Sequence, residues 1–487
     1  MSDGPATPTA PGLPASDGGV PLVVDVDGTL IRTDLLHEAV LQFVAHHPLQ
    51  AWRLLTWTLA GKAALKTSLA DRVDCGADTV PLCDEVVDVI RAAQAAGRSV
   101  YLASASDRRY VEAIAARIGG IAGVFATDAS ANLAGASKAE RLTGAFGKSG
   151  YDYVGNGKVD YPVWRSARTS FVVSASARFS RDVGRAFPHS RLLAQRAPRP
   201  HDYLRALRMH QWAKNVLVFL PLLAGHTFDP ETIGRTILAF LCFCMAASSA
   251  YILNDLLDLP GDRAHHRKRN RPFASGAVPV AHGPPLAALL LAAALAGAAL
   301  LPIWFFGVLV LYVTATLAYS LVLKRKLLID VIVLGGLYTV RVLGGVAAVG
   351  VEQSPWLLMF SLFLFLCLAI VKRCSELVAR RAAGGAETVG RGYLVEDLYV
   401  LLGLAGASGF GAVLVVSLYI TSPEVQELYA SPQRLWLICP LLLYWVSRVV
   451  VLSNRGTLHD DPVVFALTDK VSWVVGSLIA VVVAVAI

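Results

Sequence analysis

The chain has 487 residues, of which 55% are hydrophobic and 16% are charged, with a formal net charge of +8 and a mean hydropathy of +0.53. The length argues against one compact domain, and the low charged fraction excludes a chain that is soluble throughout, because soluble chains average about a quarter charged residues. Anionic lipids or phosphorylated substrates explain the positive charge, so we expect no nucleic-acid partner. The seven cysteines form no CxxC pair and predict neither a zinc site nor a disulfide framework.

The first part of the chain has the pattern of a short tail followed by an α/β domain. Residues 1–19 are rich in Ala, Pro, Gly and Ser and have neither a cationic start nor an apolar core, so they predict a disordered tail and not a signal peptide. Residues 20–197 contain no run long enough to span a bilayer. Their short apolar runs alternate with helical patterns and predict a mainly parallel sheet. The expected strands are 20–26, 100–103, 123–126, 151–154, 171–173 and 191–194.

Acidic residues end the first expected strand. Asp25 and Asp27 stand two apart in the sequence Asp-Val-Asp-Gly-Thr, and the carboxyl end of a parallel strand is where chemically useful groups belong. Two such aspartates can divide the roles of nucleophile and general acid/base. Later expected strands are followed by polar residues that could complete the site, namely Ser104, Lys138 and Asp160.

Residues 20–197 resemble the haloacid dehalogenase superfamily through these motifs, and the resemblance implies a Rossmann-like phosphatase fold. It identifies Asp25 as the nucleophile that forms an aspartyl-phosphate and Asp27 as the acid/base. Ser104 and Lys138 correspond to the groups that hold the phosphoryl oxygens and shield their charge.

The same resemblance implies a Mg²⁺ site in this domain. Asp160 would bind the metal together with the carboxylate of Asp25 and the backbone carbonyl of Asp27. The family often has a second acid where this chain has Asn156, which leaves the metal site one charge poorer. An active phosphatase and a degenerate domain that serves only for docking both stay open.

Residues 31–97, between the first two expected strands, are predicted to be mostly helical and to form a cap over this site. Within the cap, the stretch from Trp52 to Lys66 is apolar with cations near its ends. It fits a helix that rests on the membrane surface, and it also fits the core of the cap.

A proline-broken linker at 196–200 precedes the second part of the chain, 198–487. Apolar segments near the length that crosses a bilayer, ~20 residues, dominate this part. They predict an all-α, multi-pass bundle of about nine membrane helices. The expected spans are 214–228, 233–254, 283–301, 303–323, 327–350, 355–371, 397–421, 434–453 and 470–487.

Loop charges predict the orientation of the bundle. Lys and Arg gather in alternate loops, whereas the opposite loops carry little positive charge. The basic loops should face the cytoplasm, so we expect a protein of the inner membrane. The α/β domain precedes the first span and should lie on the same cytoplasmic side, which agrees with reduced cysteines. The basic loops are at 263–271, 324–326, 372–391 and 455.

An acidic stretch follows an almost uncharged apolar run. Asp255, Asp258 and Asp262 are spaced i, i+3 and i+7 and would share one face of a helix. Oxygen-rich clusters of this kind suit Mg²⁺, which keeps several waters and is completed by substrate phosphates. The stretch by itself fits both a site for a Mg²⁺-bound diphosphate and a solvated loop with ordinary ion pairs. Cations that suit the phosphates follow downstream, and they include Lys268 and Arg271.

Other charged residues lie on the same predicted face or inside a span. Arg341 falls within an apolar span, where a charge is expensive and should face a cavity or a partner. It could contact a substrate phosphate or form a structural ion pair. The charged residues expected in cytoplasmic loops or at helix ends are Lys324, Asp330, Lys372, Arg373, Glu376, Asp461 and Asp469.

Residues 203–487 resemble the UbiA-type intramembrane prenyltransferase superfamily through the motif Asn-Asp-x-x-Asp-x-x-x-Asp that begins at Asn254. Those enzymes have a second acidic motif, and at the corresponding place this chain has Asp330 followed by Leu334 instead of a second acid. The pattern is closer to the branch of decaprenyl-phosphate phosphoribosyltransferases. The similar stretches in that branch surround Lys214, Tyr251, Lys324, Arg341, Lys372 and Asp461.

This second resemblance implies a reaction in which phosphoribose moves from phosphoribosyl diphosphate to a polyprenyl phosphate, with Asp255 and Asp258 central to catalysis. The α/β domain would then remove the 5-phosphate of the lipid product. Two alternatives stay open, a prenyl transfer to an aromatic acceptor and a phosphatase anchored by an inert membrane part, as does the oligomeric state. The implied Mg²⁺ ligands are Asn254, Asp255, Asp258 and Asp262, and the implied phosphate contacts are Lys214, Lys268, Arg271, Lys324, Arg341, Lys372 and Arg373.

Overall fold

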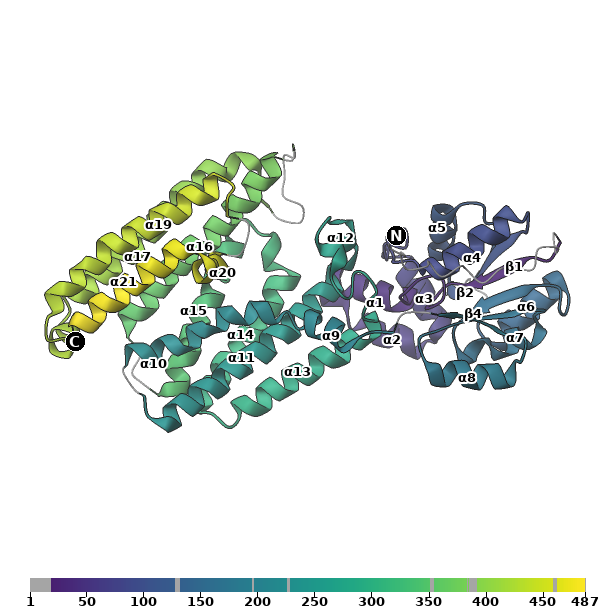
Figure 1. Cartoon of the computed structure of the whole chain (residues 1–487), viewed down its shortest axis with the longest axis horizontal. Helices are drawn as coiled ribbons and strands as arrows, with labels where there is room; N and C mark the ends of the chain where they lie inside the picture. Colours follow the sequence, from purple (N-terminus) through teal and green to yellow (C-terminus); the bar gives the residue numbers. More distant parts are fainter. Residues whose placement is uncertain are drawn as a thin grey trace, which may run out of the picture. The chain divides into compact units, whose positions relative to one another are not determined.

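The computed structural model describes residues 19–127, 132–194, 197–225, 228–350, 354–382, 384, 392–458 and 462–486. Most of the expected tail and Asp461 lie outside these described residues. The chain forms two compact units, and each is built from two stretches of sequence. The first unit contains the α/β domain and the acidic stretch, and the second contains most of the membrane helices (Figure 1). Their bounds are Met1–Leu207 with Ile252–Leu286, and Arg208–Tyr251 with Ala287–Ile487.

A six-stranded parallel sheet forms the centre of the α/β domain, as predicted. The strand order is β3-β2-β1-β4-β5-β6, with Leu22 of the first strand opposite Val100 and Asp152 of its two neighbours. The first strand therefore lies where the strand order reverses, which is the place where sheets of this kind bind ligands. The strands are β1 (Leu22–Asp25), β2 (Val100–Asp107), β3 (Gly123–Thr127), β4 (Asp152–Gly155), β5 (Ser170–Ser174) and β6 (Arg191–Ala194).

Helices cover both faces of this sheet (Figure 1). Side chains alternate along β1, so Leu22 and Val24 enter one apolar core while Val23 enters the other, next to Tyr153. The α-helices of the domain are α1 (Leu35–His46), α2 (Arg53–Leu59), α3 (Lys62–Ala70), α4 (Asp84–Ala95), α5 (Arg108–Ile118), α6 (Ala136–Phe146), α7 (Tyr161–Ser166), α8 (Ala177–Ala186) and α9 (Pro200–Ala206), with 3₁₀ turns η1 (Pro48–Gln50) and η2 (Lys158–Asp160).

The segment expected to form the cap is mostly helical and contains α1 to α4. The apolar stretch from Trp52 to Lys66 combines features of both interpretations left open by the sequence. Trp57 packs against the core of the domain, whereas Leu55 and Leu59 on the same helix are 66% and 80% exposed. Helix α2 therefore buries one face in the domain and leaves an apolar face uncovered.

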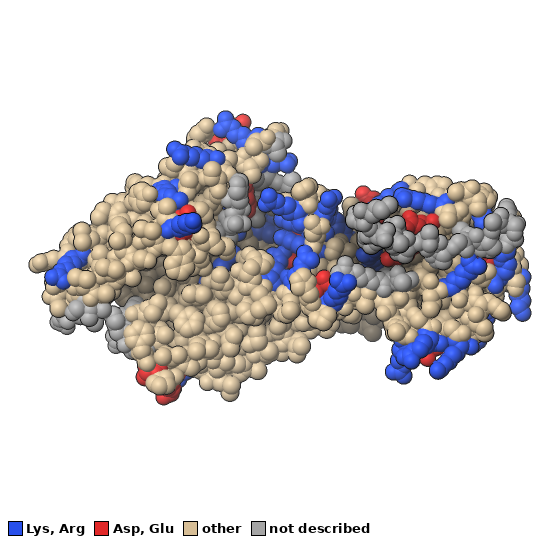
Figure 2. All heavy atoms as spheres, viewed as in Figure 1, with Lys and Arg blue, Asp and Glu red and all other residues tan. Residues whose placement is uncertain are grey.

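The remaining helices are mostly long and apolar, which confirms the predicted helical membrane part. On the face shown in Figure 2, charged side chains are scarce over most of the bundle. The elements are η3 (Met209–Phe219), α10 (Leu220–Ala224), α11 (Pro230–Leu257), α12 (Leu259–Ala264), η4 (Lys268–Asn270), η5 (Val280–His282), α13 (Gly283–Ala298), α14 (Ile303–Leu321), η6 (Leu323–Arg325), α15 (Ile329–Val349), α16 (Pro355–Ala382), η7 (Val395–Asp397), α17 (Leu398–Ile420), α18 (Pro423–Leu428), η8 (Pro432–Leu437), α19 (Ile438–Asn454), α20 (Pro462–Thr468) and α21 (Lys470–Ala486).

Seven helices in the described parts of the chain are long and apolar enough to cross a membrane, and a bent pair, α20 with α21, raises this number to eight. The sequence had suggested about nine. The difference lies at the first expected span, 214–228, which folds into the 3₁₀ helix η3 and the five-residue helix α10. Pro221 lies within the first turn of α10, where its missing N–H is tolerated, so a helix can begin there but not run through it unbroken.

Two candidate active sites

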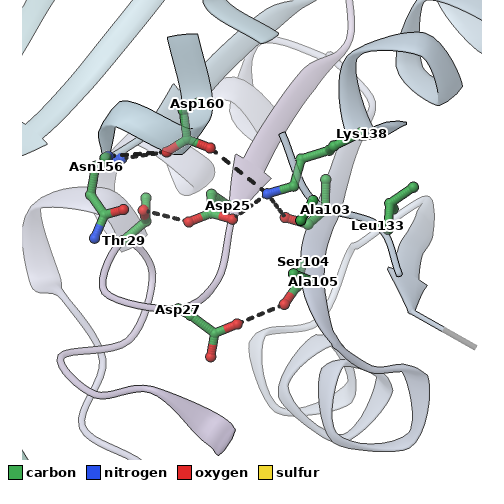
Figure 3. A network of polar contacts seen from close by, with 12 residues as sticks. Asp25, Asp27, Thr29, Ala103, Ser104, Ala105, Leu133, Lys138, Asn156 and Asp160 are labelled. Carbon is green, nitrogen blue, oxygen red and sulfur yellow. Dashed lines mark hydrogen bonds and ion pairs between the residues drawn. The ribbon is translucent and has the colours of Figure 1, made fainter. Parts of the chain in front are cut away.

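The first candidate site lies at the carboxyl end of β1. Asp25 is the last residue of this strand, and Lys138 of α6 places its Nζ 2.7 Å from Asp25 Oδ1 and 3.8 Å from Asp160 Oδ1 (Figure 3). The hydroxyl of Thr29 donates a hydrogen bond of 2.9 Å to the other oxygen of Asp25. All four residues come from different segments, and the structure brings together the three of them that the sequence had predicted.

Asp27 is held by three donors. Its Oδ2 accepts hydrogen bonds of 2.7 and 2.8 Å from the hydroxyls of Ser104 and Ser106, and its Oδ1 accepts one of 2.9 Å from the backbone N–H of Leu35. Ser104 was predicted to hold phosphoryl oxygens, and in this structure its hydroxyl instead donates to the predicted acid/base (Figure 3). The arrangement fixes the orientation of the Asp27 carboxylate before any substrate binds.

Asp160 anchors the loop that follows β4. Its Oδ2 accepts the backbone N–H groups of Asn156 and Gly157, both at 3.1 Å, and its Oδ1 accepts the hydroxyl of Tyr153 at 2.9 Å. Direct metal binding by Asp160 stays a prediction, because all of these contacts orient the loop and Lys138 rather than leave the carboxylate open. The oxygen donors around Asp25 nevertheless have the chemistry that Mg²⁺ prefers.

Gly28 is required at the turn that directly follows Asp27. Its φ of +69° is left-handed, where side chains other than glycine are strained. A Cβ at this position would lie 2.3 Å from Nδ2 of Asn156. The amide of Asn156 therefore reaches the turn directly, and it occupies the place where the resembling family often has an acid.

Burial tunes the protonation of the first site. It raises the pKa of Asp25 to about 7, and it raises the pKa of Asp27 despite the hydrogen bonds that favour the charged carboxylate. Burial alone lowers the pKa of Lys138, but the carboxylates of Asp25 and Asp160 reverse that effect and raise the pKa. The site thus combines a charged lysine with two carboxyl groups whose pKa values burial raises.

Residues that the sequence had not indicated also contribute. Ser106 stands two residues after Ser104 on β2, so the period of a strand could have shown that both face Asp27. Lys66 reaches from the cap to the carbonyl oxygen of Ala105 at 2.6 Å, and burial lowers its pKa. No local spacing signals that contact, because it depends on the fold of the cap.

The second candidate site is the acidic stretch after α11. The helix ends at Leu257, and a new short helix begins at Leu259, so the three aspartates do not share one continuous helical face as the spacing had predicted. Asp255 and Asp262 are nevertheless brought together, because Nη1 of Arg271 lies 3.2 Å from one carboxylate and 2.5 Å from the other. We call residues 254–276 the acid loop.

The donors in the acid loop fit Mg²⁺ by chemistry but are engaged with protein groups. Asn254 donates a hydrogen bond of 3.1 Å to Asp258, and Arg271, predicted to bind phosphate, is paired with two aspartates. Among the residues that the structure describes, no group of three or more His, Cys, Asp or Glu side chains is arranged to hold a metal ion. Lys268 lies on η4, next to the acid loop's other cations.

In the second compact unit, Arg373 forms the centre of a buried network. It donates to Asp330 at 2.6 Å, to Glu376 at 2.6 Å and to the hydroxyl of Tyr319 at 3.0 Å, while Tyr393 also donates to Asp330. The sequence had predicted Arg373 as a phosphate contact. Its burial among these acceptors gives it a structural role that ties α15 to α16.

Arg341 and Lys214 are two buried cations near one aromatic ring. Arg341 donates to Asn215 Oδ1 at 2.7 Å and to the hydroxyl of Tyr312 at 2.9 Å. These partners are neutral oxygens and not the carboxylate that an ion pair needs. The ring of Tyr338 lies 5.5 Å from the Arg341 guanidinium and 5.9 Å from the Lys214 ammonium. Their convergence suits an anion.

The other predicted residues lie elsewhere. Asp469 receives both Nη groups of Arg448 at 2.7 and 3.0 Å and accepts the N–H of Ser472, so it stabilises the bend between α20 and α21. Lys324 lies on η6 and Lys372 on α16. Asp461 is outside the described residues.

Comparison with known proteins supports both parts of the chain. The model of the UbiA prenyltransferase family matches residues 215–468, and that of the haloacid dehalogenase-like hydrolases matches residues 22–165. A solved structure of a UbiA homolog from Archaeoglobus fulgidus bound to GPP and Mg²⁺ is similar over 58% of this chain and 99% of its own, with 17% identity and a TM-score of 0.46.

Relatives extend over different parts of the chain. The protein y4nM of Sinorhizobium fredii is 38% identical over 96% of this chain and 91% of its own length. The nodulation protein NoeC of Azorhizobium caulinodans is 33% identical over 56% of this chain and 89% of its own length. The decaprenyl-phosphate phosphoribosyltransferase of Mycobacterium tuberculosis is 35% identical over 38% of this chain and 62% of its own. The chain is therefore a multi-pass membrane protein that belongs to the UbiA prenyltransferase family and has an N-terminal haloacid dehalogenase-like domain.

Proposed function

We propose that the chain transfers phosphoribose from phosphoribosyl diphosphate to a polyprenyl phosphate, and that its N-terminal domain then removes the 5-phosphate of the lipid product. The observation that carries the proposal is the acid loop, in which Asp255, Asp262 and Arg271 meet at the end of the apolar helix α11. The similarity to decaprenyl-phosphate phosphoribosyltransferases supports the choice of substrates. Both reactions would occur at the cytoplasmic face of the inner membrane, where positive loops are retained.

The acid loop has the groups that a diphosphate leaving group needs. Mg²⁺ bound by Asn254, Asp255, Asp258 and Asp262 would neutralise charge on the departing diphosphate. Arg271 supplies a guanidinium, the cation best suited to bidentate binding of phosphate. The polyprenyl phosphate needs no base to attack the ribose carbon, because its oxygen is already ionised.

Buried cations in the second unit suit the acceptor. Lys214 and Arg341 lie among aromatic rings and neutral oxygens, where an anion would gain more from them than in water. We assign the acceptor's phosphate to this pair. The isoprenoid tail of the acceptor would then lie among the apolar helices.

The phosphatase reaction follows from the first site. Asp25 attacks the phosphorus, the bond from phosphorus to the sugar oxygen breaks, and Asp27 gives its proton to that oxygen. Asp27 then takes a proton from the water that hydrolyses the aspartyl-phosphate, which releases phosphate, frees the carboxylate of Asp25 and returns Asp27 to its protonated form. Lys138 stabilises the charge on Asp25 and on the phosphoryl oxygens, and a bound Mg²⁺ would add to this stabilisation.

Phosphatase and transferase in one chain fit a sequential reaction. A lipid that has received phosphoribose still has a phosphomonoester at its 5-position, which is the group that the N-terminal domain is equipped to remove. Because both sites belong to one chain, the lipid product is presented to the phosphatase at a high effective concentration.

The prenyl-transfer alternative is disfavoured by the second acidic motif. Leu334 stands where such enzymes have a second acid, and the remaining Asp330 is engaged by Arg373 and Tyr393. A site that binds prenyl diphosphate between two acidic, metal-binding motifs therefore lacks one of the two acids of its second motif.

The test supplies membranes containing the protein with labelled phosphoribosyl diphosphate, polyprenyl phosphate and Mg²⁺, and resolves the products by chromatography and mass spectrometry. We expect label in a lipid whose ribose has no 5-phosphate, and in its phosphorylated precursor when Asp25 is replaced by Asn. Label that stays in water-soluble material would reject the transferase proposal. A parallel reaction with prenyl diphosphate and an aromatic acceptor tests the alternative.

A further inference from the structure

A buried ion pair joins the phosphatase domain to the acid loop within the first compact unit. Glu38 of α1 is fully buried, and its two carboxylate oxygens lie 2.6 and 3.2 Å from the guanidinium nitrogens of Arg263, whose side chain is 4% exposed. The two residues are 225 positions apart in sequence. Arg263 directly follows Asp262, so this contact reaches the proposed donor site itself.

Arg263 also connects the two limbs of the acid loop. Its Nε donates a hydrogen bond of 3.2 Å to the carbonyl oxygen of Ala274, which lies three residues beyond Arg271. One limb contains Asp262 and the other contains Arg271, and these two residues form the ion pair at the centre of the loop. A guanidinium held in place by Glu38 therefore fixes how the two limbs meet.

Further contacts between the same segments show that the ion pair is part of a packed surface. Gln42, one helical turn after Glu38 on α1, donates to the carbonyl oxygen of Leu257 at the end of α11. A Cβ added at Gly276 would lie 2.7 Å from Cβ of Arg32, so the acid loop approaches the phosphatase domain closely there too.

The same helix also contacts the phosphatase site. The N–H of Leu35, the first residue of α1, donates to Asp27, and the hydroxyl of Thr33 donates to Glu38 at 2.7 Å. The start of helix α1 thus contacts Asp27, the predicted acid/base of the first site. Glu38, about one turn later on the same helix, contacts Arg263 of the acid loop.

We infer that Glu38 is a positioning residue for the transferase reaction, so that the phosphatase domain holds the loop that binds the donor. The inference rests on the proposed role of the acid loop in donor binding. It gives the N-terminal domain a second role that does not require its own catalysis. Removing the charge of Glu38 would leave Arg263 buried without its counterion, which proteins tolerate poorly.

The test compares Glu38→Gln with the parent in the full-length protein in membranes. We expect transfer to fall by about tenfold or more, mainly through a higher KM for phosphoribosyl diphosphate and a greater Mg²⁺ requirement, because the binding loop is displaced. Phosphate release from a soluble monoester should stay within about twofold, which shows that the domain is folded. Asp25→Asn is the converse control, because it should stop phosphate release and leave transfer unchanged. Transfer by Glu38→Gln at the parental rate and KM would overturn the inference.

Two further variants keep the test decisive. In Arg263→Lys a cation still faces Glu38, but an ammonium cannot also hold the Ala274 carbonyl through a rigid fork, so transfer should fall with normal phosphate release. In Glu38→Gln/Arg263→Gln the loss should be smaller than the sum of the losses in Glu38→Gln and Arg263→Gln, because both changes remove the same ion pair. Additive losses would contradict the pairing.

Hydrogen–deuterium exchange gives a measurement that needs no substrate. Residues 254–276 should exchange faster in Glu38→Gln than in the parent, while exchange in an exposed-site control, Glu140→Gln on α6, should match the parent. Unchanged exchange of the acid loop would overturn the inference even if the substrates were misassigned. A parent that makes no lipid product, with the loop destabilised as expected, would instead refute only the proposed reaction.

Discussion

The two acidic sites of the first unit share one arrangement of charges but lie on different kinds of structure. In each, a cation lies between two carboxylates: Lys138 between Asp25 and Asp160, and Arg271 between Asp255 and Asp262. The first site lies on strand ends that the sheet fixes. The second lies on a loop with two helix breaks, held from outside by the phosphatase domain.

The difference teaches how far each site can adjust. Sheet-based positions are over-determined by neighbouring strands, whereas a loop takes the arrangement that its contacts impose. Lys138 is almost fully buried and should stay in place during catalysis, whereas the side chain of Arg271 is 25% exposed and can exchange a carboxylate for a phosphate. The predictions below test this contrast, in order of decreasing effect.

Replacing the nucleophile should have the largest effect. Asp25→Asn removes the attacking oxygen but retains the shape of the side chain, so phosphate release from a soluble monoester should fall by ~1,000-fold or more. Transfer to lipid should continue, and the product should retain its 5-phosphate. The control is Asp182→Asn, an exposed carboxylate on α8 of the same domain. Phosphate release unchanged from that of the control would refute the assignment of the nucleophile.

A substitution in the acid loop should have the opposite effect, with loss of transfer and retention of phosphate release. Asp255→Asn removes one of the two charges that flank Arg271 and one proposed ligand of Mg²⁺. We expect lipid product to fall by about 100- to 1,000-fold, because weaker binding of the cation leaves charge on the departing diphosphate without a counterion. Phosphate release from a soluble monoester should stay near the parental rate. Asp229→Asn, at the exposed start of the same helix α11, serves as the matched control. Equal activity of the two variants in transfer would mean that the acid loop does not bind the donor.

The phosphatase site was largely predictable because its residues follow strand ends at recognisable spacings. Asp25, Asp27 and Lys138 were predicted from sequence. In the structure Lys138 lies 2.7 Å from Asp25, and Ser104 lies 2.7 Å from Asp27. The resemblance could not show that Asp160 accepts hydrogen bonds from the loop backbone, because these bonds depend on the local turn.

The loop site and the membrane cations were predictable as a set of residues but not in their roles. Arg373 was predicted to contact phosphate, and the structure shows that it also forms buried ion pairs with Asp330 and Glu376 that the sequence did not indicate. Glu38 and Arg263 resemble ordinary surface charges in sequence. Only the packing of segments 225 residues apart reveals that they are buried together.

The pH dependence of the two activities should differ. Burial raises the pKa of Asp25 to about 7, so below that pH the carboxyl holds its proton and cannot attack. At low Mg²⁺, phosphate release should fall about tenfold for each pH unit below 7 and level off above it. Saturating Mg²⁺ should move the midpoint to lower pH, because a cation favours the charged carboxylate. Initial rates from pH 5 to 9 check this, and a flat profile at low Mg²⁺ would contradict the protonation that burial imposes.

The smallest expected effect concerns the uncovered apolar face of α2 and of the turn η1 before it. Leu49 and Trp52 precede the helix, Leu55 and Leu59 lie on it, and the four side chains are 63% to 92% exposed. Helix α1, which precedes this face, lies against η5, and η5 runs directly into the membrane helix α13. An apolar helix face that the domain leaves uncovered is suited to the lipid interface. We therefore expect α2 to rest on the bilayer and bring the phosphatase to its lipid substrate.

Leu55→Glu tests this expectation. A charge there should reduce dephosphorylation of the lipid product by only about threefold to tenfold, since one of four apolar contacts with the membrane is lost. Hydrolysis of a soluble monoester and the free energy of unfolding should barely change, because surface substitutions usually alter stability by less than about 0.5 kcal/mol. Leu192→Glu, at an exposed leucine of β6, is the matched control. If the two variants handle lipid equally well, the face of α2 does not touch the membrane.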